Sequence, residues 1–201
     1  MATMESLLEL VSDHGVEFVD LRVVDLIGRW RHVTIPVERF DEALVEQGVA
    51  FDASNLGYAT IEGSDMLLSP DLETAVLVEH DGDPILALIC DIQLPGGGAF
   101  PGDPRAVARR AEQRLAAEAI ADTMQMSPEF ECYVFGAANS IHDPCEFGVS
   151  LEPLGPPTQR SLYHACPPED RLFALRNAIC RDLQARGIEV KYHHHEVGAF
   201  G

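Results

Sequence analysis

The sequence predicts an α+β protein of two domains, and three observations support this. Helical and strand-like patterns are mixed through the first part of the chain, as is typical of a small mixed domain. A run rich in glycine and proline over residues 94–101 then interrupts both patterns and predicts a linker. Helical and strand-forming segments resume after it. We therefore expect one domain over residues 1–100 and a second over residues 101–201.

The N-terminal domain is expected to begin with a helix. An amphipathic pattern covers residues 5–14, and Gly15 follows as a typical end of a helix. Residues 49–65 carry no clear period and are expected to form a loop. The remaining expected elements are strands over residues 16–24, 29–35, 66–68, 74–78 and 85–91, and a helix over residues 40–46.

The second domain is expected to open at Asp103 and Pro104, a favourable cap and first residue of a helix. Residues 136–166 are rich in Gly, Pro and Ser and predict an extended loop. The other expected elements are helices over residues 104–119 and 168–186 and strands over residues 123–126, 130–135 and 188–197. The buried stripe of the last helix is expected to consist of Leu172, Leu175, Ile179 and Leu183.

The composition narrows the classes of function. The chain has 33 acidic and 14 basic residues and a net charge of -19, which disfavours binding to nucleic acid. The longest apolar run, residues 84–90, is too short to cross a membrane, and the residues after Met1 do not resemble a signal peptide. The 5 cysteines form no CxxC pair, which is typical of reduced thiols in a cytoplasmic protein.

Glu129 and Glu131 are the first candidate metal ligands. On the expected strand, alternation places both carboxylates on one face, where they repel each other. A divalent cation removes this repulsion, and carboxylate oxygens suit Mg²⁺ or Mn²⁺. The alternative is an ordinary solvated strand face.

A histidine triplet followed by Glu196 provides a second group of candidate ligands. On a strand, His194 and Glu196 share one face, while His193 and His195 share the other. At least one histidine must therefore have a role other than binding a metal beside Glu196. The alternative is a polar sheet rim whose histidines bond to backbone carbonyls.

Two aspartates lie in the expected loop of the first domain. Asp52 stands in Phe51-Asp52-Ala53-Ser54, and Asp65 stands in Gly63-Ser64-Asp65-Met66. From the residues alone, turn chemistry explains both, because Asp and Ser favour turns.

Taken in order, these motifs resemble the bacterial type I family of glutamine synthetases over essentially the whole chain. Residues 18–22 are similar to the opening of that family's N-terminal β-grasp domain. Residues 51–54 resemble its Phe-Asp-Gly-Ser-Ser loop, and residues 63–68 resemble its Glu-Ser-Asp-Met stretch. Residues 128–131 and 194–197 look like its first metal-ligand motifs. The resemblance implies a β-grasp domain followed by the first part of an α/β catalytic domain.

The resemblance also implies a reaction: glutamate and ATP form γ-glutamyl phosphate, and ammonia displaces the phosphate. Mg²⁺ or Mn²⁺ would serve as cofactor, with two or more ions per site, and ATP as substrate. The enzyme would be a cytoplasmic homo-oligomer, a double-ring dodecamer in the family, whose active sites form between adjacent subunits.

The resemblance assigns a role to each candidate residue. Glu131 and Glu196 would hold the ion of the glutamate site, and Glu129 would hold the ion at the ATP phosphates. Asp52 and Asp65 would bind ammonium or substrate, and Asp52 would help to deprotonate ammonium in the site of a neighbouring subunit. The residues expected near the nucleotide are Lys191 and His194.

The chain departs from the family pattern in several places. Lys191 stands where the family has a nucleotide-contacting glutamate, and Ala53 and Asn55 change the ammonium loop. Family members continue beyond the position of Gly201 with further ligands, so we expect the 201-residue chain alone to be inactive. Two alternatives stay open: a ligase that joins glutamate to a polyamine or another amine, and a non-catalytic or regulatory subunit that docks on full-length rings.

Overall fold

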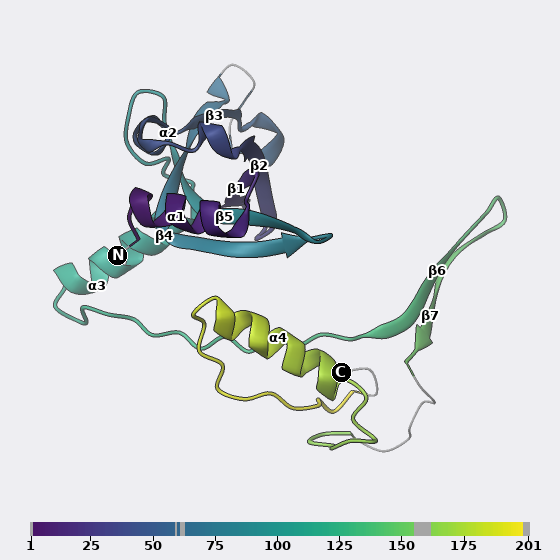
Figure 1. Ribbon diagram of the computed structural model, residues 1–201. Coiled ribbons are helices and arrows are strands. Elements are labelled where there is room, and N and C mark those ends of the chain that lie inside the picture. Colours follow the sequence, from purple (N-terminus) through teal and green to yellow (C-terminus); the bar gives the residue numbers. More distant parts are fainter. Residues whose placement is uncertain (1, 59, 61–62, 155–161, 199–201) are drawn as a thin grey trace. The chain divides into compact units, whose positions relative to one another are not determined.

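The computed structural model describes residues 2–58, 60, 63–154 and 162–198 (Figure 1). The chain divides into two compact units, Met1–Gln125 and Met126–Gly201. Both helices and strands form in each unit, which confirms the predicted α+β class.

A five-stranded sheet with the order β2-β1-β5-β4-β3 forms the centre of the N-terminal unit. The central strands β1 and β5 run parallel, and the other neighbouring pairs are antiparallel. The strands are β1 (Phe18–Val24), β2 (Trp30–Pro36), β3 (Val49–Asp52), β4 (Asp65–His80) and β5 (Asp83–Gln93).

Helix α1 (Met4–His14) forms where its amphipathic pattern predicts it. Thr3 and Ser6 cap its first turn reciprocally, and Gly15 ends it at a φ of 64°, a left-handed conformation that glycine adopts without a steric penalty. Its buried residues Leu7 and Val11 join the core of the sheet. The other helices of this unit are α2 (Glu42–Gln47) and α3 (Pro104–Ala117), and the short turns η1 (Val37–Arg39) and η2 (Ser54–Leu56) are 3₁₀ helices.

The core lies on the sheet and is built from alternating apolar residues of β1, β4 and β5. Burying one leucine of this kind contributes roughly 2 kcal/mol to the free energy of unfolding. The largest fully buried side chains are Leu21, Leu68, Leu86, Leu88, Ile92, Val19 and Cys90.

The prediction of a loop over residues 49–65 is wrong at both of its ends. Residues 49–52 form β3, which pairs with β4 in antiparallel register from Val49 opposite Leu68 to Asp52 opposite Asp65. The two short strands expected over residues 66–68 and 74–78 are parts of one strand, β4, whose pairing with β5 shifts register between Asp71 and Val76. An irregularity of this kind interrupts the period of a sequence pattern without ending the strand.

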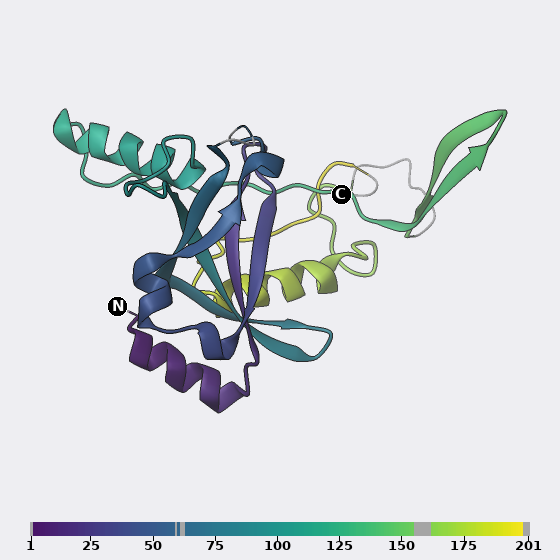
Figure 2. The same cartoon turned by 90° about the horizontal axis from the view of Figure 1, so that it is seen from above.

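The described part of the C-terminal unit contains a β-hairpin and one helix. Strands β6 (Phe135–Asp143) and β7 (Glu146–Pro153) form the hairpin, which extends away from helix α4 (Phe173–Ala185) in Figure 2. The prediction of a loop over residues 136–166 is therefore wrong over its first half. Residues 155–161 of that prediction lie outside the described residues.

Further predictions for residues 123–197 are wrong. Of the strands expected over residues 123–126, 130–135 and 188–197, only Phe135 is in a strand, as the first residue of β6, and the other residues are not assigned as regular structure. These segments have strand-forming residues, but a strand also needs a hydrogen-bonding partner, and the described residues provide none for them. In the expected stripe of α4 only Leu172 is buried, whereas Leu175 and Ile179 are 43% and 46% exposed.

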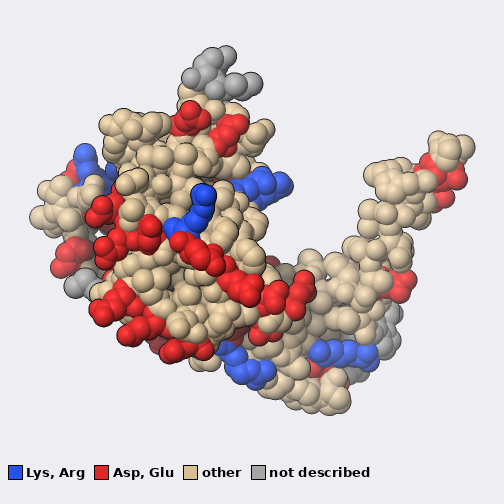
Figure 3. Space-filling model, turned by 45° about the horizontal axis from the view of Figure 1, so that its top comes forward, with Lys and Arg blue, Asp and Glu red and all other residues tan. Residues whose placement is uncertain are grey.

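Acidic side chains spread over the face of the N-terminal unit that is visible in Figure 3, in keeping with the net charge of -19. Among the described residues, no helix is both long and apolar enough to cross a membrane.

Candidate metal centre

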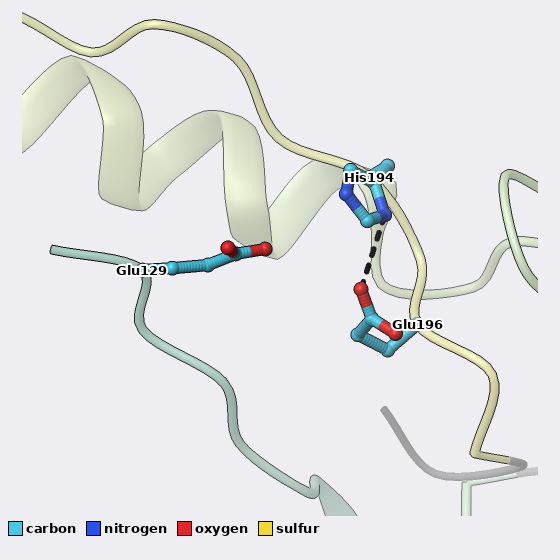
Figure 4. Close-up of side chains that lie close together, drawn as sticks. All are labelled: Glu129, His194 and Glu196. Atoms are coloured by element: carbon cyan, nitrogen blue, oxygen red, sulfur yellow. Dashed lines mark ion pairs between the residues drawn. The ribbon is translucent and has the colours of Figure 1, made fainter. Parts of the chain in front are cut away.

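Three potential ligands come together in the C-terminal unit. Glu129, His194 and Glu196 each offer one ligand atom, and these atoms all lie within 4.8 Å of one another. Glu129 lies in the irregular segment between α3 and β6, and its carboxylate points toward the other two side chains (Figure 4). Glu129 is exposed, and the side chains of His194 and Glu196 are 18% and 29% exposed.

Polar groups and aromatic rings both contact the His194 imidazole. Its Nδ1 lies 3.5 Å from Glu196 Oε1 and 3.2 Å from the carbonyl oxygen of His195. Its ring lies 4.4 Å from the His164 ring and 5.3 Å from the Tyr163 ring, measured between centroids. These contacts fix the plane of the imidazole beside the Glu196 carboxylate.

The other two histidines of the triplet are engaged elsewhere. The ring of His193 contacts Arg176 through Nδ1 and Asn177 through Nε2, at 3.1 and 2.9 Å. His195 is 3% exposed, and its Nδ1 lies 2.7 Å from the Glu196 carbonyl oxygen. His194 is thus the member of the triplet that is grouped with the two glutamates.

The donor set fits a divalent cation of the Mg²⁺ or Mn²⁺ type. Two carboxylates and one imidazole are ligands that Mn²⁺ accepts readily, whereas Mg²⁺ prefers oxygen alone. Ligands about 2.1 Å from a common ion lie up to about 4.2 Å apart, so the three atoms need only a small movement to share one.

Glu131 is exposed and is not part of this group among the described residues. The sequence pairs it with Glu129 through strand alternation, but residues 129–131 are not in a strand. Its assignment to the ion of the glutamate site stays a prediction.

The ammonium-loop candidates lie in the N-terminal unit. Asp52 ends β3 and stands directly opposite Asp65 on β4, so two exposed carboxylates share one end of this strand pair. Hydrogen bonds from the Ser54 side chain, the Ser54 backbone and the Ser64 side chain hold the pKa of Asp52 below its usual value. Asp52 is consequently ionised at neutral pH.

Lys191 is exposed, and its Nζ lies 5.1 Å from the centroid of the Tyr192 ring. No sequence pattern predicts the side chains that surround the triplet, namely Tyr163, His164 and Arg176. A helix pattern that contains Arg176 gives no sign that this side chain meets His193, which lies beyond the end of the helix.

The fold and the acidic ligand group define a mixed α+β protein with a candidate divalent-metal centre. Two family models match it in sequence: the β-grasp domain of glutamine synthetase over residues 15–95 and the catalytic domain of glutamine synthetase over residues 101–200. The chain therefore belongs to the glutamine synthetase family, and the expected β-grasp domain is confirmed.

Known proteins resemble the chain over its whole length. Glutamine synthetase of Azotobacter vinelandii is 35% identical over 216 residues, which cover 98% of this chain and 46% of that protein. A protein named 3-hydroxylaminophenol mutase, from Cupriavidus pinatubonensis, is 34% identical over 217 residues, covering 99% of this chain and 46% of that protein. The chain thus spans about half the length of the curated relatives that it matches.

The fold is also similar to a solved structure. A cryo-electron microscopy structure of Plasmodium falciparum glutamine synthetase has a TM-score of 0.81 and 23% identity, covering 100% of this chain and 43% of that chain. At this identity, the likeness concerns the fold alone.

Proposed function

We propose that the chain forms part of an ATP-dependent ligase that joins ammonia to glutamate through γ-glutamyl phosphate. The observation that carries this proposal is the convergence of Glu129, His194 and Glu196 within 4.8 Å, in a chain of the glutamine synthetase family. Phosphoryl transfer needs groups that hold cations beside the transferred phosphate, and this group of ligands meets that need.

Glu129, His194 and Glu196 would hold Mn²⁺ or Mg²⁺, and Glu131 is proposed as a ligand of a further ion. When held there, the cation would supply positive charge beside the ATP phosphates. Lys191 and His194 are proposed to lie near the nucleotide. A binding site of three ligands does not by itself orient a phosphoryl acceptor, so we expect the 201-residue chain in isolation to bind metal without turnover.

Asp52 and Asp65 are proposed to bind ammonium. Their carboxylates stand opposite each other on β3 and β4, where two like charges are unfavourable unless a cation lies between them. The Asp52 carboxylate is negatively charged at neutral pH, so it can attract ammonium, and we propose that it also helps to deprotonate it. In the proposed homo-oligomer, a double-ring dodecamer by family, Asp52 serves the site of a neighbouring subunit.

Steady-state kinetics on the intact protein that carries this sequence test the proposal. ADP release is expected to require glutamate, ammonium and Mn²⁺ or Mg²⁺ together. Asp52→Asn is expected to lower kcat/KM for ammonium by about 100-fold, the usual worth of a positioned general base. The control Asp83→Asn changes an exposed aspartate at the start of β5 and is expected to leave the rate unchanged. ADP release that is independent of glutamate would contradict the proposal.

The same assay can also identify the amine that is joined to glutamate. Ala53 and Asn55 alter the loop that follows Asp52, so we propose comparing ammonium with methylamine and a polyamine in this assay. A higher kcat/KM for an amine would assign the protein to an amine ligase. Association with full-length rings without any ADP release would assign it to a docking subunit.

A further inference from the structure

His193 is anchored to helix α4, although it stands next to a candidate metal ligand. Arg176 donates a hydrogen bond from Nε to His193 Nδ1 at 3.1 Å, and His193 Nε2 lies 2.9 Å from Asn177 Oδ1. The Phe173 ring lies 5.8 Å from the His193 ring. All three partners belong to the first turns of α4.

Arg176 is itself held in place by a buried carboxylate. It forms an ion pair with Asp170, whose side chain is 2% exposed against 16% for Arg176. The second oxygen of Asp170 accepts a hydrogen bond from the Leu172 backbone at 3.1 Å. The guanidinium therefore has little freedom to move, and it presents Nε to His193 in a fixed direction.

This arrangement determines the tautomer of His193. A guanidinium can only donate, so Nδ1 must be the acceptor and carries no proton. In the neutral imidazole the proton then resides on Nε2, which donates to Asn177 Oδ1. Both ring nitrogens are engaged, so His193 is unavailable as a metal ligand.

One donor of the network lacks a hydrogen-bond partner among the described residues, which lowers the stability that the network adds. Arg176 Nη1 is buried, and among the described residues it has no hydrogen-bond partner. A buried ion pair with an unsatisfied donor contributes less to stability than a fully satisfied one. Such a pair is better explained by the geometry that it imposes than by the stability that it adds.

The segment that bears the ligands has no partner strand among the described residues. Residues 188–197 are not paired in a sheet, so no strand ladder fixes their backbone. We propose that the Asp170–Arg176–His193 network is a positioning device: it holds His193 against α4 and thereby orients His194 and Glu196 toward Glu129. This inference rests on the metal centre of the proposed function.

Titration calorimetry with Mn²⁺ on the full chain tests the proposal. Arg176→Lys keeps a cation for Asp170 but cannot reproduce the fixed Nε donor, and it is expected to weaken Mn²⁺ binding by about 10- to 100-fold, as loss of an outer-shell partner does. Arg181→Lys, an exposed position on the same helix, is the matched control and is expected to bind as the wild type does. Equal affinity of Arg176→Lys and wild type would overturn the inference and leave the metal centre intact.

A second pair of variants keeps the test valid if Arg176→Lys does not fold. His193→Gln retains an acceptor and a donor and is expected to preserve affinity within about threefold, whereas His193→Leu retains neither and should lose at least about tenfold. Equal affinities of the two variants would overturn the inference. Failure of the wild type to bind Mn²⁺ would contradict both the proposed metal centre and the proposed positioning role of the network.

The tautomer of His193 tests the hydrogen-bond network itself, independently of metal binding. Long-range ¹H–¹⁵N spectra of histidine-labelled protein are expected to show His193 as the Nε2–H form, and its signals are identified by their loss in His193→Gln. An Nδ1–H form would overturn the network regardless of metal binding.

Discussion

Three adjacent histidines have three different environments. His193 bonds to side chains of α4, His195 is buried, and His194 lies beside Glu196. Alternation along an extended segment explains why neighbours face opposite ways, and it holds here even though the segment is not in a sheet. The sequence could therefore predict that His194 and Glu196 share a side.

Removing one ligand tests the metal group at the scale of the residue. Glu196→Gln is expected to weaken Mn²⁺ binding by at least about 100-fold, because even the loss of an outer-shell partner costs about 10- to 100-fold. Isothermal titration calorimetry measures this, with Glu189→Gln, an exposed glutamate of the same segment, as control. Similar losses in both variants would mean that general charge, rather than a ligand, attracts the ion.

At the scale of the elements, the best predictions were those with local causes. Asp103 and Pro104 start α3, and Gly15 ends α1, because caps and left-handed glycines are encoded within a few residues. The strand β3 and the hairpin β6–β7 were missed because their pairing partners decide them. Prediction of the site is limited for the same reason. Glu129 and His194 are far apart in the sequence and come together only in the folded chain, so no local pattern predicts their contact.

Asp20 is a buried aspartate in β1 whose carboxylate bonds to side chains of the neighbouring strand β2. Burial opposes ionisation of Asp20, but hydrogen bonds from Arg22, His32 and Thr34 outweigh it and hold its pKa below the usual value. A lowered pKa stabilises the fold fully above the ordinary value of 3.8, and the contribution is lost as the pH falls through the lower folded value.

Asp20→Asn is therefore expected to destabilise the N-terminal unit by about 2 kcal/mol at pH 7, since it removes a buried carboxylate that accepts hydrogen bonds from partly exposed side chains. Urea unfolding at several pH values measures this, with the exposed Asp13→Asn as control. The deficit of Asp20→Asn should shrink below about pH 4, where the wild type loses its own advantage. A deficit that is constant down to the lowest pH would contradict the role of the ionised carboxylate.

At the scale of the whole molecule, an irregular segment of the chain contains the boundary between the two compact units. No helix or strand is assigned between Ala117 and Phe135, and this segment contains Glu129. Exposed chymotrypsin sites occur in it, including Met126, Phe130 and Tyr133, which are 76%, 90% and 65% exposed.

Limited proteolysis is expected to separate the two units. Because exposed segments without regular structure are cleaved first, chymotrypsin should cut early within residues 124–133 and leave the N-terminal unit as a resistant fragment. Mass spectrometry of the early products identifies the cut. Early cleavage inside β1 or β5 would instead show that the sheet is not the stable core described here.

The central claim is that one imidazole and two carboxylates of this chain bind a common cation. Pulsed electron paramagnetic resonance of the Mn²⁺-loaded protein tests it most directly, because a coordinated histidine nitrogen modulates the electron spin echo. We predict ¹⁴N modulation from a single imidazole in the wild type and in His193→Gln, and its loss in His194→Gln. Absence of ¹⁴N modulation in the wild type, or its persistence in His194→Gln, would contradict the account.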